Sequence, residues 1–151
     1  MSQAVFVDTS GWLAAANPRE THHLEAAAAY DNLVTGRIRL VTTNLVVAEM
    51  HILVVREQGS RAGCALLDAI YTDPLYTVVA TTRELESTAT DRWLRPFQDQ
   101  RFSLADAVSF EVMRLEGITE AFALDHHFEV AGYTLIPAPP KRSQGKRRPR
   151  R

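Results

Sequence analysis

The sequence predicts an α/β fold, with a central, mainly parallel sheet of four to five strands and helices on both faces. Short runs of β-branched and aromatic residues alternate along the chain with longer stretches of helical character. Parallel strands need such crossovers of a dozen or more residues, whereas antiparallel strands can be joined by tight turns. The 151 residues, 46% of them hydrophobic and 23% charged, have the composition and length of a single globular domain.

The first half of the chain is expected to contain two strands and four helices. Its strands are the β-branched runs AVFV and RLVT. Gly36, Gly59 and two Asx-Pro pairs supply helix stops, because Gly and Pro commonly end helices. The expected order is a strand over 4–7, helices over 12–16 and 21–34, a strand over 39–42, and helices over 44–58 and 60–71.

The second half continues the alternation and then changes character. The expected elements are a strand over 76–80, helices over 83–94 and 103–115, and strands over 121–124 and 134–136. After Ile136 the sequence is rich in proline and then in basic residues, and it cannot build a core. We therefore expect a folded domain over residues 1–137 and a disordered tail over residues 138–151.

The charge of the chain is divided between these two parts. Residues 1–140 contain ten arginines against eighteen Asp and Glu, whereas both lysines lie in the last eleven residues. The cationic residues of this basic tail are Lys141, Arg142, Lys146, Arg147, Arg148, Arg150 and Arg151. Such a cluster without interleaved aromatics favours sequence-independent attraction to an RNA backbone. A solubilising extension and a contact for an acidic partner protein are the alternatives.

The N-terminus and the cysteine content indicate a cytoplasmic protein without a membrane segment. MSQAVFVD lacks the features of a signal peptide, and no stretch reaches the roughly 18 apolar residues of a membrane span. The single cysteine, Cys64, excludes an intrachain disulfide and fits a reducing compartment. Because Gly63 and Ala65 flank it in a helical stretch, we expect Cys64 to be a small buried residue.

Two aspartates follow directly after predicted strands. Asp8 ends AVFVD, and Asp125 ends AFALD. In open α/β sheets, ligands bind beyond the carboxyl ends of the strands, so both side chains are candidates for a site. The alternative is that each aspartate only caps the helix that follows it.

Two further acids lie on predicted helices. Glu49 sits in NLVVAEMHILVV, which is apolar on nearly all sides and typical of a buried helix. A buried carboxylate needs either an arginine partner or a metal ion in a cleft. The alternative to a metal site is a buried Glu49–Arg pair, or a Glu49 side chain that reaches solvent near the start of the helix. Asp106 follows Ser103 at the spacing of a capping box. A capping acid in the first turn is also compatible with a site at the edge of the sheet, so both interpretations of Asp106 stay open.

The proposed winding of the sheet brings these four carboxylates together. Ionised carboxylates about 5 Å apart repel each other by about 3 kcal/mol per pair at an effective dielectric constant of about 20. Either shared protons or a hard divalent cation must compensate such a cluster, and Mg²⁺ or Mn²⁺ prefers oxygen ligands and substrate phosphate. The cluster therefore predicts metal-assisted hydrolysis of phosphodiester bonds in a nucleic acid.

Four segments resemble, in the same order, the signature blocks of PIN-domain ribonucleases. They are VDTSGWLA, TTNLVVAEM, SLADAVSFEVM and ALDHHF. The resemblance spans residues 5–137 and is to the small VapC-type toxins of toxin-antitoxin modules. It implies a three-layer sandwich, with a parallel sheet between helices, and endonucleolytic cleavage of RNA.

The resemblance also implies roles for individual residues. Ser10 would orient Asp8 through its hydroxyl, and Asn44 would support the helix that carries Glu49. A toxin of this class further implies a cognate antitoxin as partner and a homodimer. In the family's pattern, the acids that bind Mg²⁺ or Mn²⁺ and carry the catalysis are Asp8, Glu49, Asp106 and Asp125.

Three other functions are considered. A housekeeping nuclease of RNA maturation would use the same site without an antitoxin. In a non-catalytic RNA-binding module, the acids would be helix caps and the basic tail would bind RNA. A phosphatase with a nucleophilic aspartate requires D-x-D-x-T, and the segment Asp8-Thr9-Ser10 lacks the second acid.

The five histidines do not form a zinc-enzyme motif. His22-His23 and His126-His127 are adjacent pairs whose members cannot point the same way on a helix, and H-E-x-x-H is missing from the sequence. We expect a structural or surface role, and the alternative places His126 or His127 near a substrate phosphate.

Overall fold

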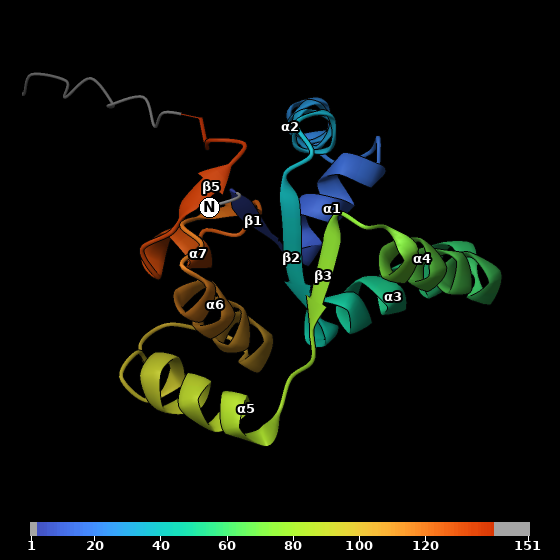
Figure 1. The fold of residues 1–151 in the computed structure, drawn as a ribbon. Helices are drawn as coiled ribbons and strands as arrows, with labels where there is room; N and C mark the ends of the chain where they lie inside the picture. Colours follow the sequence, from blue (N-terminus) through green and yellow to red (C-terminus); the bar gives the residue numbers. More distant parts are fainter. Residues whose placement is uncertain (1–2, 141–151) are drawn as a thin grey trace, which may run out of the picture.

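A computed structural model describes residues 3–140 and places them in three layers (Figure 1). The middle layer is an all-parallel sheet of five strands in the order β3-β2-β1-β4-β5. The strands are β1 (Ala4–Val7), β2 (Arg39–Thr43), β3 (Tyr76–Val79), β4 (Glu120–Phe122) and β5 (Thr134–Ile136). The predicted α/β class and the parallel sheet are confirmed.

Helices cover both faces of this sheet. Figure 1 shows α3 and α4 on one side of it and α5 and α6 on the other. The helices are α1 (Thr9–Ala16), α2 (His23–Thr35), α3 (Asn44–Gln58), α4 (Ser60–Thr72), α5 (Arg83–Ala89), α6 (Leu104–Glu116) and α7 (His127–Val130), and a π-helical turn, η1 (Thr90–Leu94), continues α5. The predicted helix over 83–94 is thus present in two parts.

The centre of the sheet forms the core. Phe6 of β1 and Phe122 of β4 are fully buried, as are Val5, Val7 and Ala121 of the same strands. Phe110 of α6 and Phe128 of α7 pack against each other with their rings 5.1 Å apart in an edge-on contact. Central parallel strands are covered on both faces, so the buried strands β1 and β4 hold the residues that follow them in fixed positions.

Two predicted element boundaries differ from the structure because polar side chains intervene. α1 begins at Thr9 rather than near residue 12, because the Asp8 carboxylate caps it by accepting from the Ser10 backbone N–H. β4 ends at Phe122 rather than at Leu124, because the Leu124 N–H donates to the Ser10 hydroxyl instead of joining the sheet. Both exceptions centre on the first residues after β1.

The expectation that the helix carrying Glu49 is buried on nearly all sides is wrong. Only Val46, Val47 and Met50 of α3 are buried, and Ile52 is 58% exposed. The reason is that α3 pairs with α4 beside the sheet (Figure 1), so only part of its surface meets the core. The expectation that Cys64 is buried is also wrong, because α4 exposes it.

The C-terminal end of the described part follows β5. Residues 138–140 are exposed and form no regular element. The basic tail residues 141–151, with their expected disorder and attraction to RNA, lie outside the described residues. Within residues 3–140, no helix combines the length and hydropathy needed to cross a membrane.

Gly11 allows α1 to pack closely on the end of β4. A Cβ atom at this position would meet the Phe122 carbonyl oxygen and lie 2.7 Å from the Cδ1 atom of the Phe122 ring. Because this backbone cannot move freely, we expect Gly11→Ala to lower the free energy of unfolding by about 1–3 kcal/mol, measured by urea denaturation. Gly117→Ala is not a matched control, because Gly117 has a positive φ of 66°. Ala16→Gly, at an exposed position of the same helix, should cost only about 1 kcal/mol through helix propensity. An unchanged stability for Gly11→Ala would contradict the close approach.

Candidate active site

Three of the four predicted acids follow the carboxyl ends of the central strands, and the fourth lies on α6. Asp8 comes directly after β1, and Asp125 comes three residues after the end of β4. Glu49 lies in the second turn of α3, which follows β2 without a loop. Asp106 lies in the first turn of α6, on the opposite side of the sheet from α3 (Figure 1).

Asp8 is both a helix cap and a buried acid. It is 8% exposed, and its Oδ2 accepts hydrogen bonds from the Ser10 backbone N–H at 3.1 Å and from the Ser10 hydroxyl at 2.6 Å. Its Oδ1 takes part in no hydrogen bond within residues 3–140. One oxygen of Asp8 therefore fixes the turn into α1, and the other is available to a ligand.

Ser10 connects the ends of β1 and β4. Its hydroxyl donates to Asp8 and accepts from the backbone N–H groups of Leu124, at 3.0 Å, and Asp125, at 3.4 Å. These contacts fix both the orientation of the Asp8 carboxylate and the start of the segment that carries Asp125. The geometry supports the orienting role that the sequence suggested for Ser10.

Asp106 takes part in two sets of contacts through a single oxygen. Its Oδ2 accepts from the Ser103 backbone N–H at 2.9 Å, and the Ser103 hydroxyl accepts from the Asp106 N–H at 3.0 Å, which completes the predicted capping box. The same Oδ2 lies 3.1 Å from Nδ1 of His127. The capping interpretation is therefore correct, and it is compatible with a role of Asp106 in the same site as the other acids.

His127 joins Asp106 to Asp125. Besides its contact with Asp106, its Nδ1 lies 3.6 Å from Oδ2 of Asp125, and its backbone N–H donates to Oδ1 of Asp125 at 2.9 Å. The His127 ring packs edge-on against Phe102, with the ring centres 5.2 Å apart. A histidine that was expected to have a structural or surface role thus contacts two of the four acids.

Glu49 is linked to the first acid through the neighbouring threonine. The Thr9 hydroxyl lies 3.2 Å from Glu49 Oε2 and 3.4 Å from the Val46 carbonyl oxygen. Glu49 itself is exposed at the open side of α3. The sequence did not single out Thr9, although a hydroxyl residue directly after a strand-end aspartate is a signal that could have done so.

Asn44 holds α3 in place from its first residue. The N-cap of α3 is Thr43, and the Asn44 side-chain oxygen instead accepts from the backbone N–H of Thr81 at 2.9 Å and from its hydroxyl at 2.7 Å. Thr81 lies just after β3, so this contact ties the start of α3 to the edge strand. The support expected from Asn44 is thus anchoring of the helix end, several residues before Glu49.

The charges of the neighbouring acids act on the pKa values of Asp8 and Glu49. Burial raises the pKa of Asp8, the hydrogen bonds from Ser10 oppose this, and the charges of Asp106 and Asp125 raise it further. Although the Glu49 residue is exposed, partial desolvation of its carboxyl raises its pKa against the hydrogen bond from Thr9, and the other three acids add to the rise. The negative charge of this cluster is therefore incompletely compensated.

The donor set fits a hard divalent cation. Within residues 3–140, no arginine pairs with any of the four acids, so the expected alternative of a Glu49–Arg pair is wrong. The other alternative, that Glu49 reaches solvent near the start of the helix, agrees with its exposure. Carboxylate oxygens are the ligands that Mg²⁺ and Mn²⁺ prefer, and Asp8 offers one that takes part in no hydrogen bond. A cation at this edge of the sheet would supply the missing compensation.

Ser10→Ala should weaken this site without unfolding the protein. The change removes the hydroxyl that orients Asp8 and the acceptor for the Leu124 N–H. Loss of an outer hydrogen bond of this kind costs about 10–100-fold in metal affinity, which we expect in a Mn²⁺ titration. Ser60→Ala, at an exposed position at the start of α4, serves as control and should leave the affinity unchanged. Equal Mn²⁺ affinities for Ser10→Ala and Ser60→Ala would exclude the orienting role.

Comparison with known protein families agrees with the resemblance seen in the sequence. Residues 5–132 match the family model of the PIN domain. The chain therefore belongs to the PIN-domain family, and the resemblance to VapC-type members is confirmed.

Two relatives show how closely the chain matches known proteins. It is 35% identical over 132 residues to the 23S rRNA-specific endonuclease VapC20 of Mycobacterium tuberculosis, covering 87% of this chain and 97% of that protein. The crystal structure of the same VapC20, described as a sarcin-ricin loop cleaving toxin, superposes with a TM-score of 0.74. The structure of FitAcB from Neisseria gonorrhoeae, at 14% identity, has a TM-score of 0.62 over 87% of this chain and 95% of that chain, and it shows the shared fold.

Proposed function

We propose that this protein is a divalent-metal-dependent endoribonuclease and the toxin component of a type II toxin-antitoxin system. The observation that carries the proposal is that, besides desolvation, the charges of Asp106 and Asp125 raise the pKa values of both Asp8 and Glu49, with no arginine partner for any of the four acids in the described residues. Membership of the PIN-domain family and the similarity to an endonuclease toxin support it.

The four acids would hold Mg²⁺ or Mn²⁺, and the surrounding side chains would hold the acids. When bound, such a cation neutralises the charge of the phosphodiester and activates water for hydrolysis. Thr9 positions Glu49, Ser10 positions Asp8, and His127 sets the spacing between Asp106 and Asp125. Burial of Asp8 lowers the effective dielectric constant around its carboxylate, which strengthens the interaction of this carboxylate with a cation.

The remaining parts of the proposal concern binding partners. The basic tail would attract RNA to a domain whose own charge repels it, and the attraction should weaken with salt. A cognate antitoxin and a homodimer are proposed from the likeness to VapC-type toxins, with the cytoplasm as the site of action. Ribosomal RNA is the first substrate to test, because the 35% identical relative is a 23S rRNA-specific endonuclease.

An RNA cleavage assay with defined metals tests the function. The full chain is incubated with 23S rRNA and with unrelated RNA in Mn²⁺, in Mg²⁺ and in EDTA. We expect endonucleolytic products with either cation and none in EDTA. Cleavage that persists in EDTA would contradict the metal-dependent mechanism. If no cleavage appears with any cation, while deletion of residues 141–151 abolishes RNA binding, the protein is an RNA-binding module instead.

Growth measurements separate a toxin from a housekeeping nuclease. Induced expression of the wild-type chain should arrest growth of the host, whereas Asp106→Asn should not. Normal growth with an active wild-type nuclease present would contradict the toxin assignment and favour a role in RNA maturation.

A further inference from the structure

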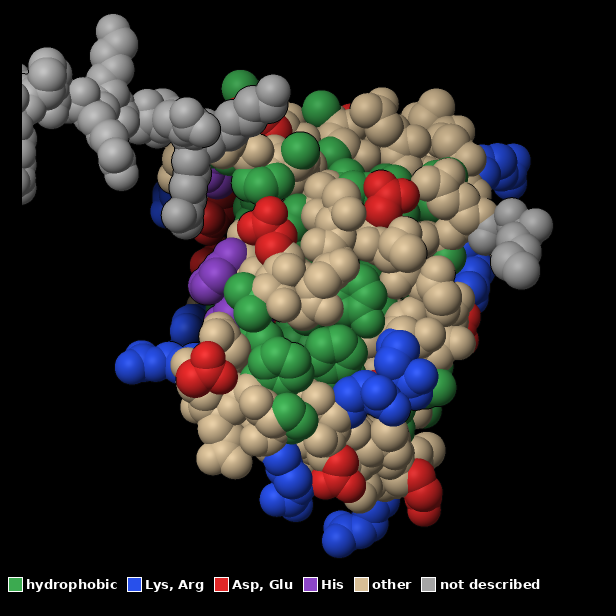
Figure 2. Space-filling view, turned by 90° about the vertical axis from the view of Figure 1, so that its left-hand side faces the viewer, with side chains coloured by type: hydrophobic (Ala, Val, Ile, Leu, Met, Phe, Trp, Pro, Cys, Tyr) green, Lys and Arg blue, Asp and Glu red, His purple; other side chains and the backbone are tan. Residues whose placement is uncertain are grey.

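Three consecutive residues after β4 bring metal-binding atoms of two kinds together. One ligand atom each from Asp125, His126 and His127 lies within 4.8 Å of the other two, which is the only such group of three His, Cys, Asp or Glu residues within residues 3–140. Figure 2, which looks from the left-hand side of Figure 1, shows histidine side chains beside acidic ones at the edge of this face. This trio adds imidazole nitrogens to a site otherwise made of oxygen.

The distances in the trio suit a tetrahedral ion. Bond lengths of about 2.0–2.1 Å place neighbouring ligand atoms of tetrahedral Zn²⁺ about 3.4 Å apart. Nδ1 of His126 lies 3.6 Å from one oxygen of Asp125, and Nδ1 of His127 lies 3.6 Å from the other. Each histidine therefore already lies near ligand spacing from one oxygen of Asp125, and because the two contacts use different oxygens, a bound ion requires a small adjustment.

The remaining adjustment falls on the most mobile member of the trio. The His126 side chain is 73% exposed, and its ring centre already lies 4.8 Å from that of the His127 ring, so it can adjust at the surface while staying beside the other two. His127, at 18% exposure, is held by Phe102 and by its backbone hydrogen bond to Asp125. A fixed pair of ligands and a rotatable third ligand at the surface leave an entry path from solvent.

The chemistry of these ligands separates Zn²⁺ from the cations of the acidic cluster. Imidazole suits Zn²⁺, whereas Mg²⁺ takes carboxylate, carbonyl and water oxygens. Asp125 belongs to both groups, and His127 contacts Asp106 through the same Nδ1 that faces Asp125. An ion bound to the trio would therefore withdraw Asp125 from the acidic cluster and break the contact that spaces Asp106.

We propose that Asp125, His126 and His127 form a binding site for Zn²⁺ and that its occupation inhibits the nuclease. Binding of Zn²⁺ stands on the geometry alone, whereas inhibition rests on the function proposed above. His126 is the residue that distinguishes the two sites, because it belongs to the zinc site and lies outside the acidic cluster.

Zinc binding is measured first, without reference to activity. Protein lacking a polyhistidine tag competes with a chromophoric chelator for Zn²⁺, and we expect one equivalent bound by the wild type. His126→Ala should lower the zinc affinity by at least about tenfold. His22→Ala is the matched control, because His22 and His23 are also an adjacent, partly exposed pair with an acid nearby, yet form no three-ligand group. The proposal is overturned if His126→Ala binds Zn²⁺ as tightly as His22→Ala does.

Inhibition is measured next in the RNA cleavage assay with Mn²⁺. Each variant is compared with its own rate in the absence of zinc, so that any direct effect of the substitution cancels. Zn²⁺ at the wild-type dissociation constant should halve the rates of the wild type and of His22→Ala, and it should leave His126→Ala almost unaffected. Equal inhibition of all three proteins, or stimulation by zinc, would overturn the inhibitory role.

The two measurements separate the zinc site from the proposed function. Zinc binding that depends on His126, in a protein that cleaves no RNA with any cation, would support the site and refute the nuclease. Cleavage without His126-dependent zinc binding would support the nuclease and refute the site.

Discussion

Replacing Asp8 with asparagine should lower the rate of Mn²⁺-supported RNA cleavage by at least about a hundredfold, because a ligand of the cation is lost while the fold is kept. Asparagine can still accept the two hydrogen bonds from Ser10, so the turn into α1 should survive. Asp31→Asn, on the exposed surface of α2, is the control and should cleave at the wild-type rate. A Mn²⁺-dependent rate for Asp8→Asn within threefold of wild type would show that Asp8 does not belong to the catalytic site.

The same substitution should stabilise the metal-free protein. Burial and the neighbouring acids raise the pKa of Asp8 in the folded chain, so ionised Asp8 destabilises the fold. As the pH rises past the ordinary value of 3.8, the unfolded chain loses its proton first, and the folded wild type becomes less stable relative to it. In EDTA, Asp8→Asn should therefore gain stability over the wild type with rising pH. Adding Mn²⁺ should raise the melting temperature of the wild type but much less that of the variant. A stability advantage that falls with rising pH would contradict the raised pKa.

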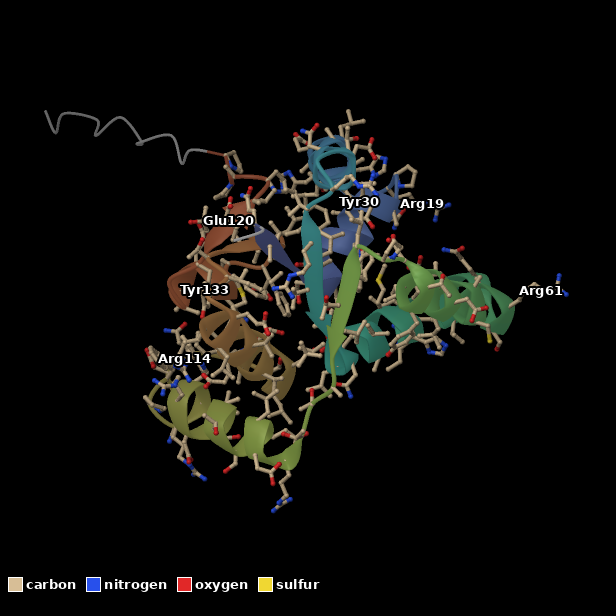
Figure 3. The ribbon with its side chains drawn as sticks, in the orientation of Figure 1. Arg19, Tyr30, Arg61, Arg114, Glu120 and Tyr133 are labelled. Atoms are coloured by element: carbon tan, nitrogen blue, oxygen red, sulfur yellow. The ribbon has the colours of Figure 1, made fainter. Side chains whose placement is uncertain are left out.

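Replacing Glu111 with alanine should give the largest loss of stability, about 3 kcal/mol in the free energy of unfolding. The Glu111 side chain is completely buried in α6, where it accepts a hydrogen bond from the Trp93 indole at 3.0 Å and pairs with Arg114 at 2.7 Å and Arg92 at 3.3 Å. Figure 3 shows Arg114 and Tyr133 near each other on the left-hand side of the molecule, where α6 lies. Alanine would leave a cavity and an indole N–H without its acceptor.

The pH dependence of Glu111 runs opposite to that of Asp8. Burial alone would raise the pKa of Glu111, but the hydrogen bonds from Arg114 and Trp93 outweigh it, and the pKa is lowered. Glu111 thus stabilises the fold above its ordinary pKa of 4.5, and this contribution is lost as the pH falls through the lowered value. Glu111→Gln should differ from wild type near neutral pH and approach it in acid.

Two controls show whether the effect of Glu111 comes from burial. Glu116→Ala, on the same helix but in an exposed pair with Arg39, should cost less than about 1 kcal/mol in urea denaturation. Mn²⁺ affinity of Glu111→Ala should stay close to wild type, because Glu111 lies outside the acidic cluster. Equal costs for Glu111→Ala and Glu116→Ala would contradict the account of the buried carboxylate.

Local patterns in the sequence predicted the order of the elements and singled out the four acids, whose catalytic role stays a prediction. Alternation of β-branched runs with helical stretches led to the parallel sheet, and in a parallel sheet the carboxyl ends of the strands must meet at one edge. That argument was sufficient to bring Asp8 next to Asp125. It also predicted the capping box at Asp106, because such a cap depends on residues only three apart.

Features that depend on distant parts of the chain were not predictable in this way. The all-round apolar pattern of α3 indicated a buried helix, but α3 packs on α4 at the side of the sheet, and the pattern does not identify the partner. The sequence analysis did not single out Glu111, because its indole partner lies in η1, eighteen residues earlier. The bridge that His127 forms between two acids requires the relative placement of α6 and α7, which no short motif specifies.

Anomalous diffraction from crystals soaked in Mn²⁺ would test the central claim most directly. The account predicts a strong anomalous peak at the carboxyl edge of the sheet, bound by Asp8 and Asp106 together with Glu49 or Asp125, and its loss in crystals of Asp8→Asn. Manganese peaks only at surface acids elsewhere, with the Asp8 carboxylate bare at saturating Mn²⁺, would contradict it.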